Sequence, residues 1–150
     1  MKRKKILFVC TGNTCRSPMA ELILRSEIKK RKIKWWDVAS CGISAEVGGC
    51  ISQNSRLALE EIGISSDKFT PRQLTQKRIE SSVLVITMTS SQKQIIEGCG
   101  NVVSMKDICG YDIPDPYGCS LEQYRITRNA IYNACEIIIN NYILNYKENL

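Results

Sequence analysis

The chain has 150 residues, of which 43% are hydrophobic and 24% charged, a composition typical of a globular domain. This length predicts one domain, residues 1–150, with a core large enough to be stable without disulfides or bound metal. The formal charge is +6 and there is no histidine, which excludes Ser-His-Asp and Cys-His catalytic pairs.

The basic N-terminus is followed by a short apolar run, Ile6–Val9. A secretory signal needs a longer apolar region, and no later stretch is long and apolar enough to cross a bilayer. We therefore expect a cytoplasmic protein with no membrane contact. Residues 6–10 are instead typical of a strand that is buried on both faces of a parallel sheet.

The rest of the chain alternates between apolar runs and amphipathic segments. A first helix is predicted with Ser17 as its N-cap, Pro18 at its first position and Glu21 near the positive end of its dipole. Further strands are expected over residues 36–40, 82–88 and 102–104, and further helices over residues 54–62, 90–97 and 122–142. This alternation predicts an α/β fold, with a parallel sheet covered by helices on both faces and a ligand site beyond the carboxyl ends of the strands.

The segment between the first strand and the first helix reads Cys10-Thr11-Gly12-Asn13-Thr14-Cys15-Arg16-Ser17. Its consecutive N–H groups can form an anion site at the helix N-terminus, and we expect Gly12 to supply the backbone freedom for this turn. Arg16 can hold two phosphate oxygens, and the same positive field favours the thiolate of Cys10. The segment predicts attack of Cys10 on phosphorus. The alternative is a buried thiol beside a solvated arginine.

A thiolate attack needs a proton donor for the leaving group. Asp115 lies between Pro114 and Pro116, which stiffen a loop just before the last helix. We predict Asp115 as the general acid, with Asp112 as the second choice. The alternative is an exposed turn in which Asp115 has only a conformational role.

The loop, together with Asp115-Pro116-Tyr117, closely resembles the low-molecular-weight protein tyrosine phosphatases, and the likeness covers nearly the whole chain. The resemblance implies a flavodoxin-like three-layer fold with a central four-stranded parallel sheet. It implies that Cys10 forms a cysteinyl-phosphate, that Arg16 clamps the phosphate, and that Asp115 protonates the leaving group and then activates water. It also implies phosphorylated protein substrates, inorganic phosphate as product, and no metal or other cofactor.

The loop and the resemblance also predict residues that bind phosphate or substrate, or that brace the loop. Ser17 is expected to donate a hydrogen bond to the thiolate, while Asn13 and Ser40 hold the loop in shape. The predicted set is Thr11, Gly12, Asn13, Thr14, Cys15, Ser17, Ser40 and Tyr117.

Within the family, Thr11 and Thr14 resemble the bacterial protein arginine phosphatases, because tyrosine phosphatases commonly have aliphatic residues there. A phosphoguanidinium has N–H groups that need acceptors, and the Thr14 hydroxyl and the Asp115 carboxylate can supply them. Tyr117, in contrast, is the residue usual among tyrosine phosphatases, and Cys41 stands where the family usually has alanine. Phosphoarginine is the favoured substrate and phosphotyrosine the alternative.

Two other functions are alternatives to a phosphatase. Arsenate reductase shares the fold and a similar loop, but it needs relay cysteines near the end of the third strand, and residues 82–94 contain none. A non-catalytic module could bind phosphate or nucleic acid through the basic clusters at residues 2–5 and 29–34. Such a module would not need Cys10, Arg16 and Asp115 together, so nucleic acid is not the expected partner.

The cysteines do not suggest a disulfide framework or a zinc site. There is no secretory signal, no Cys-x-x-Cys pair and no histidine, so we expect most of the thiols to be small buried side chains. The eight positions are 10, 15, 41, 50, 99, 109, 119 and 135. Cys15 is close to Cys10 in sequence, and a reversible disulfide between them could protect the nucleophile from over-oxidation. The alternative is that Cys15 only packs beneath the loop.

Overall fold

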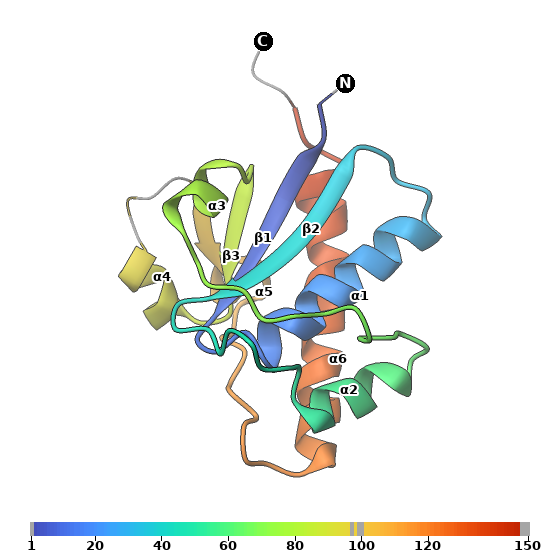
Figure 1. Cartoon of the computed structure of the whole chain (residues 1–150). Coiled ribbons are helices and arrows are strands. Elements are labelled where there is room, and N and C mark those ends of the chain that lie inside the picture. Colours follow the sequence, from blue (N-terminus) through green and yellow to red (C-terminus); the bar gives the residue numbers. More distant parts are fainter. Residues whose placement is uncertain (1, 97, 99–100, 148–150) are drawn as a thin grey trace.

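The computed structural model describes residues 2–96, 98 and 101–147. Within these residues, four parallel strands form one central sheet (Figure 1). The strands are β1 (Lys4–Cys10), β2 (Trp36–Gly42), β3 (Leu84–Thr87) and β4 (Val102–Ser104), in the spatial order β2-β1-β3-β4. Because β2 and β3 lie on opposite sides of β1, the winding of the chain reverses at β1. A sheet of this kind has its ligand crevice beyond the carboxyl end of the strand where the order reverses.

Helices cover both faces of the sheet. They are α1 (Arg16–Lys30), α2 (Gln53–Glu60), α3 (Gln76–Glu80), α4 (Ser90–Ile96), α5 (Met105–Cys109) and α6 (Leu121–Ile138), which continues as a π-helical turn, η1 (Ile139–Ile143). Helices α1, α2 and α6 lie on one side of the sheet, and α3 and α4 lie on the other (Figure 1). The predicted α/β fold with an all-parallel, four-stranded sheet is confirmed.

The two faces of β1 contribute to two separate hydrophobic clusters. Ile6 and Phe8 point into the larger cluster, which includes side chains of α1 and α6. Leu7 and Val9 point into a smaller cluster with side chains of α3 and α4. Since alternate side chains of a strand point to opposite faces, burial on both sides explains why this strand is a continuous apolar run.

Several predicted boundaries differ from the structure. Strand β3 is shorter than the predicted 82–88, β2 extends beyond residue 40 to Gly42, and the last α-helix ends at Ile138 before the π-helical turn. Helix α4 ends at Ile96, and residue 97 of the predicted helix lies outside the described residues. No helix in the described part of the chain has the length and hydropathy needed to cross a bilayer.

Two short helices were not predicted, and one predicted cap is wrong. Thr75 caps α3, and Ser104 forms a capping box with Asp107 at the start of α5. Helix α1 begins at Arg16, so Ser17 is not its N-cap and Cys15 occupies that position without a side-chain cap. The Ser17 hydroxyl is instead taken by hydrogen bonds inside the loop that precedes the helix.

Candidate active site

The segment from β2 to α2 holds the loop of residues 10–17 by its carbonyl groups. Four of these carbonyls accept backbone hydrogen bonds of 2.9–3.2 Å: Cys10 from Ile43, Thr11 from Ser44, Gly12 from Glu46 and Thr14 from Ser52. In contrast, the N–H groups of residues 11–16 donate to no other residue that the structure describes. The loop is therefore fixed from outside, and its N–H groups stay free to bind an anion.

The turn in this loop depends on Asn13 rather than on Gly12. Asn13 has a φ of 58°, in the left-handed region, whereas Gly12 is not among the residues with positive φ. The expectation that Gly12 supplies the unusual backbone angle is therefore wrong. Asparagine tolerates this conformation better than most residues because its short polar side chain can bond locally.

Gly42, at the end of β2, is required by the close approach of the loop. A Cβ atom at this position would lie 2.5 Å from the carbonyl oxygen of Thr11 and 3.0 Å from the backbone nitrogen of Asn13. Neither atom belongs to a flexible side chain, so no larger residue fits without moving the loop. The role of this glycine was not predicted from the sequence.

Buried side chains beneath the loop form a hydrogen-bond chain that ends at Cys10. The Asn13 amide donates to Ser17 Oγ at 2.8 Å and to Ser40 Oγ at 3.0 Å, and Ser40 donates to Glu21 Oε1 at 2.7 Å. Ser17 Oγ also lies 2.8 Å from Cys10 Sγ. Because Ser17 Oγ already accepts a hydrogen bond from Asn13, its own hydroxyl proton is free to point at the sulfur. This series of hydrogen bonds therefore directs the Ser17 hydroxyl, a donor, at the Cys10 sulfur, as a thiolate requires.

Glu21 anchors the far end of this chain. Its side chain is 4% exposed, and Oε2 lies 3.0 Å from the guanidinium of Arg25. The sequence predicted Glu21 only as an acidic residue near the positive end of the helix dipole. Its hydrogen bond with Ser40 was missed, because nothing in the local sequence shows that Ser40 of β2 lies opposite. Asn13 is held further by its Oδ1, which accepts from the backbone N–H of Arg72 at 2.9 Å.

Arg16 and Asp115 meet at the mouth of the loop. Arg16 is 6% exposed at its side chain, donates from Nη1 to the carbonyl of Ile113 at 3.1 Å, and has Nη2 3.7 Å from Asp115 Oδ2. Asp115 is half-exposed and accepts from the Tyr117 N–H at 3.1 Å. Asp112, the second choice for the acid, accepts instead from the N–H and hydroxyl of Ser90 at the start of α4.

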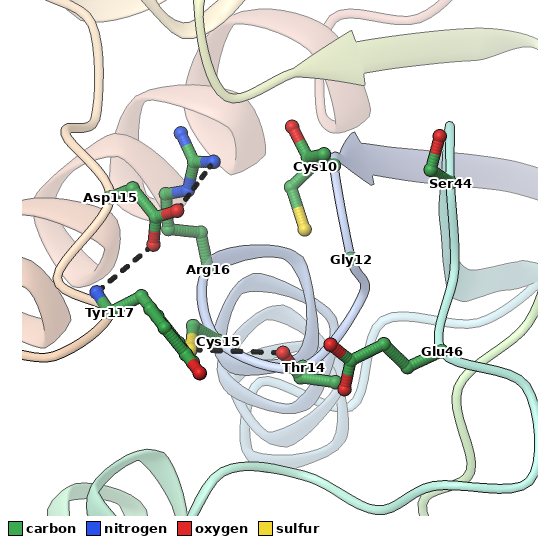
Figure 2. A pocket seen from close by; sticks show the side chains of 10 residues that line it. Cys10, Gly12, Thr14, Cys15, Arg16, Ser44, Glu46, Asp115 and Tyr117 are labelled. Atoms are coloured by element: carbon green, nitrogen blue, oxygen red, sulfur yellow. Dashed lines mark hydrogen bonds and ion pairs between the residues drawn. The ribbon is translucent and has the colours of Figure 1, made fainter.

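These groups surround a cavity of about 210 Å³ at the carboxyl end of β1 (Figure 2). Its lining consists of Cys10, Thr11, Gly12, Thr14, Cys15, Arg16, Ser44, Glu46, Asp115 and Tyr117. Of the predicted site residues, Asn13, Ser17 and Ser40 do not line the cavity and lie buried beneath the loop. Ser44 and Glu46 were not predicted, although they follow the end of β2, next to the strand where the sheet order reverses.

Gln92 is a further residue at this site that was not among the predicted site residues. It lies in α4, is almost fully buried, and donates from Nε2 to the Thr11 hydroxyl at 3.2 Å. Its Oε1 accepts from the Thr89 N–H at 3.1 Å, which fixes the direction of the amide. The Thr11 hydroxyl therefore accepts from Gln92 and keeps its own proton for another partner.

Cys15 is buried within a polar cluster on the other side of the loop. Its sulfur lies 3.3 Å from Ser52 Oγ and 3.5 Å from the Tyr124 hydroxyl of α6. Burial, together with the bond to Cys15, raises the pKa of Tyr124 above its ordinary value, so this phenol stays protonated. Both Cys10 and Cys15 are free thiols here, and the disulfide between them stays a prediction.

The other described cysteines fall into two classes. Cys41 and Cys135 are fully buried, and burial raises the pKa of Cys41 to about 12 and that of Cys135 well above its usual range. Cys50 and Cys119 are exposed and Cys109 is partly so, while position 99 lies outside the described residues. Within those residues, no three side chains of the His, Cys, Asp or Glu type are grouped so as to hold a metal ion.

The chain is similar to known proteins over almost its whole length. A family model described as low molecular weight phosphotyrosine protein phosphatase matches residues 5–147. A protein-arginine-phosphatase of Bacillus subtilis is 37% identical over 134 residues, 84% of this chain and 88% of that protein. A protein-arginine-phosphatase of Geobacillus stearothermophilus is 34% identical over 135 residues, 85% of this chain and 88% of that protein. The crystal structure of a low molecular weight protein tyrosine phosphatase from T. tengcongensis matches with a TM-score of 0.86 and 32% identity, over 91% of this chain and 98% of that one.

Proposed function

The chain belongs to the low molecular weight phosphotyrosine protein phosphatase family, and we propose that it removes phosphate from arginine side chains of proteins through a cysteinyl-phosphate intermediate. The observation that carries the proposal is the loop around Cys10, whose carbonyl groups are bonded outward while its N–H groups are uncommitted. A tetrahedral dianion needs several donors converging from one side, and this loop can provide them together with Arg16.

In the first step, the phosphoryl group binds to the N–H groups of residues 11–16 and to the Arg16 guanidinium. The Cys10 sulfur attacks phosphorus in line, so that the S–P bond forms while the P–N bond to the guanidino nitrogen breaks. Asp115 gives its proton to the departing nitrogen, which leaves as the guanidinium of arginine. The Ser17 hydroxyl, at 2.8 Å from the sulfur, stabilises the thiolate before the attack.

In the second step, water replaces the sulfur. Asp115, now a carboxylate, takes a proton from a water molecule whose oxygen attacks phosphorus, and the S–P bond breaks. Inorganic phosphate leaves and Cys10 returns to the thiolate. Asp115 is suited to both steps because it is half-exposed and lies on the pocket wall next to Arg16.

The choice of phosphoarginine is supported by the polar lining of the pocket. The side chain of Thr14 and the carboxylate of Asp115 both line the cavity, and each offers oxygen acceptors. A phosphoguanidinium carries several N–H groups that would otherwise lose hydrogen bonds to water on binding. The relatives at 34% and 37% identity are both named protein-arginine-phosphatases, which supports the same choice.

A phosphotyrosine substrate is the second candidate, and one observation favours it. The Tyr117 ring lines the cavity and is 75% exposed, so it can pack against a phenyl ring. Both substrates would use the same two chemical steps, with a phenol oxygen leaving in place of a guanidino nitrogen. In either case we propose that the substrates are phosphorylated proteins. We also propose that residues 1–150 form one domain, which the family match over residues 5–147 supports.

Catalytic efficiency on two peptides of one sequence, carrying either phosphoarginine or phosphotyrosine, tests the proposal. We expect kcat/KM to be about tenfold or more higher for phosphoarginine, since a site built to pair N–H groups discriminates against a substrate without them. The Cys10→Ser protein serves as the control, because it should bind phosphate but release no product. A wild-type preference for phosphotyrosine would refute the proposed substrate, and equal turnover by Cys10→Ser would refute the proposed nucleophile.

Thr14 gives a sharper version of this test. Thr14→Val keeps the shape of the side chain but removes the hydroxyl acceptor, so we expect the phosphoarginine to phosphotyrosine ratio of kcat/KM to fall about threefold to tenfold. Thr14→Ser, which keeps the hydroxyl, should retain most of the ratio. If the ratio is the same in wild type and Thr14→Val, Thr14 has no part in specificity.

A further inference from the structure

Glu46 is a carboxylate on the wall of the phosphate pocket that the proposed mechanism does not use. Its backbone position is set by the loop itself, because its N–H donates to the carbonyl of Gly12 at 3.2 Å. Its own carbonyl accepts from the Gly49 N–H at 2.9 Å, which closes a turn just after it. The root of the side chain is therefore held in a fixed place relative to the phosphate site.

The Glu46 side chain points along the pocket wall and has no partner of its own. It lines the same cavity as Thr14, and Figure 2 shows it on the side of the pocket away from Arg16 and Asp115. No hydrogen bond or ion pair joins it to any residue in the described part of the chain. Arg16, the cation in the pocket lining, contacts Ile113 and Asp115 instead.

An unpaired carboxylate in this place opposes the binding of a simple phosphate ester. The phosphoryl group of such a substrate carries negative charge, so it and the Glu46 carboxylate repel each other within one pocket. A phosphotyrosine ring is neutral and offers nothing that would compensate for the repulsion. A phosphoarginine differs, because its guanidinium is cationic and its outer N–H groups form a planar fork that fits a carboxylate.

We infer that Glu46 is a specificity-determining residue that binds the guanidinium of the substrate and so selects phosphoarginine over phosphotyrosine. The inference rests on the proposed function and assigns a residue to the choice of substrate. Tyr117 lines the same cavity and is largely exposed, so its ring face is available to stack on the guanidinium plane while Glu46 binds the edge.

The test replaces Glu46 and measures the same two phosphopeptides. Glu46→Gln removes the charge but keeps the size, and we expect the ratio of kcat/KM for phosphoarginine over phosphotyrosine to fall about threefold to tenfold. Efficiency on phosphotyrosine should rise, since the repulsion is removed. Glu46→Asp should keep part of the ratio. Glu60→Gln is the matched control, because its carboxylate pairs with Arg56 on α2 and lies outside the pocket, and it should change neither efficiency.

Salt separates a charge effect from a change in loop shape. Between about 0.05 M and about 0.5 M NaCl, the ratio should fall for wild type and stay flat for Glu46→Gln, because salt screens an exposed charge pair. The inference would be overturned if Glu46→Gln had the same phosphoarginine to phosphotyrosine ratio as wild type. It would also be overturned if the ratio in Glu46→Gln were lower but still fell with salt as it does in wild type. A wild-type ratio below one would overturn the proposed substrate, while the effect of Glu46→Gln on that ratio would still decide this inference. If neither protein hydrolyses phosphoarginine, both are overturned.

Discussion

At the scale of single residues, the roles that local sequence alone indicates are those within one short segment, whereas Ser40 and Tyr117 were indicated by the family resemblance and Asp115 by its proline-flanked loop and that resemblance. Cys10, Arg16 and the loop between them are adjacent in the chain, so their meeting at one pocket needed no knowledge of the fold. The contacts that were missed join distant segments. Glu21 meets Ser40 and Tyr124 meets Cys15 across separations of 19 and 109 residues, and no local pattern indicates such pairs.

Ser17 is the residue on which the state of Cys10 depends most directly. Its hydroxyl accepts from Asn13 and donates toward the sulfur, so Ser17→Ala removes the one side-chain donor that the described chain directs at Cys10. We expect kcat/KM to fall about tenfold to a hundredfold, as for a lost hydrogen bond to a charged group. The rate of alkylation by iodoacetate near neutral pH should fall in parallel, because only the thiolate reacts. The control is Ser81→Ala, at an exposed serine that ends α3, which should change neither kcat/KM nor the rate of alkylation. If Ser17→Ala were alkylated as fast as wild type, Ser17 would not stabilise the thiolate.

At the scale of elements, continuous apolar runs predicted the buried strands, and terminal residues or an amphipathic repeat predicted the longer helices, but the shortest helices have no such pattern. Helices α3 and α5 have five residues each, too few for an amphipathic repeat to be visible. Their caps were the available signal, since Ser104 and Asp107 have the spacing of a capping box. The α1 start was misplaced because Ser17 suits an N-cap by type, while its hydroxyl is engaged in the loop instead.

The junction between β2 and the loop should tolerate no side chain larger than hydrogen. In Gly42→Ala, the new Cβ would meet backbone atoms of Thr11 and Asn13 at 2.5 and 3.0 Å, so the loop must shift. We expect phosphate affinity and kcat/KM to fall by about a hundredfold or more, and the free energy of unfolding to fall by about 1–3 kcal/mol. Gly63→Ala is the matched control: its φ is 78° and its surroundings are open, so it should lose about 1 kcal/mol of stability but keep its activity. Full activity of Gly42→Ala would show that the loop can move without harm.

At the scale of the whole molecule, alternation of strands and helices predicted the layers but not the order of the strands. The order β2-β1-β3-β4 places Cys10 at the point where the sheet reverses, and it brings residues 43–52 against the loop. Only the resemblance to a known family indicated this arrangement, because strand order is decided by contacts between segments far apart in the chain. Ser44 and Glu46 were missed for the same reason.

The packing of α2 against α6 gives the molecule a pH-dependent stability that can be measured apart from catalysis. Glu61, just after α2, accepts hydrogen bonds of 2.7–3.0 Å from Arg125 and Arg128 of α6, and these bonds lower the pKa of its carboxyl from 4.5 to about 2. A carboxyl with a lowered pKa in the folded state stabilises the protein above pH 4.5, and this contribution is lost as the pH falls through about 2.

Glu61→Gln should therefore be less stable than wild type near neutral pH, and the two should converge in acid. Urea unfolding at several pH values measures the difference in the free energy of unfolding, which we expect to be largest above pH 4.5 and to shrink steadily toward pH 2. Glu60→Gln, which loses a pair with Arg56 inside one helix, should show a smaller difference at every pH. A difference between Glu61→Gln and wild type that stays constant down to pH 2 would mean that shape, and not charge, joins the two helices.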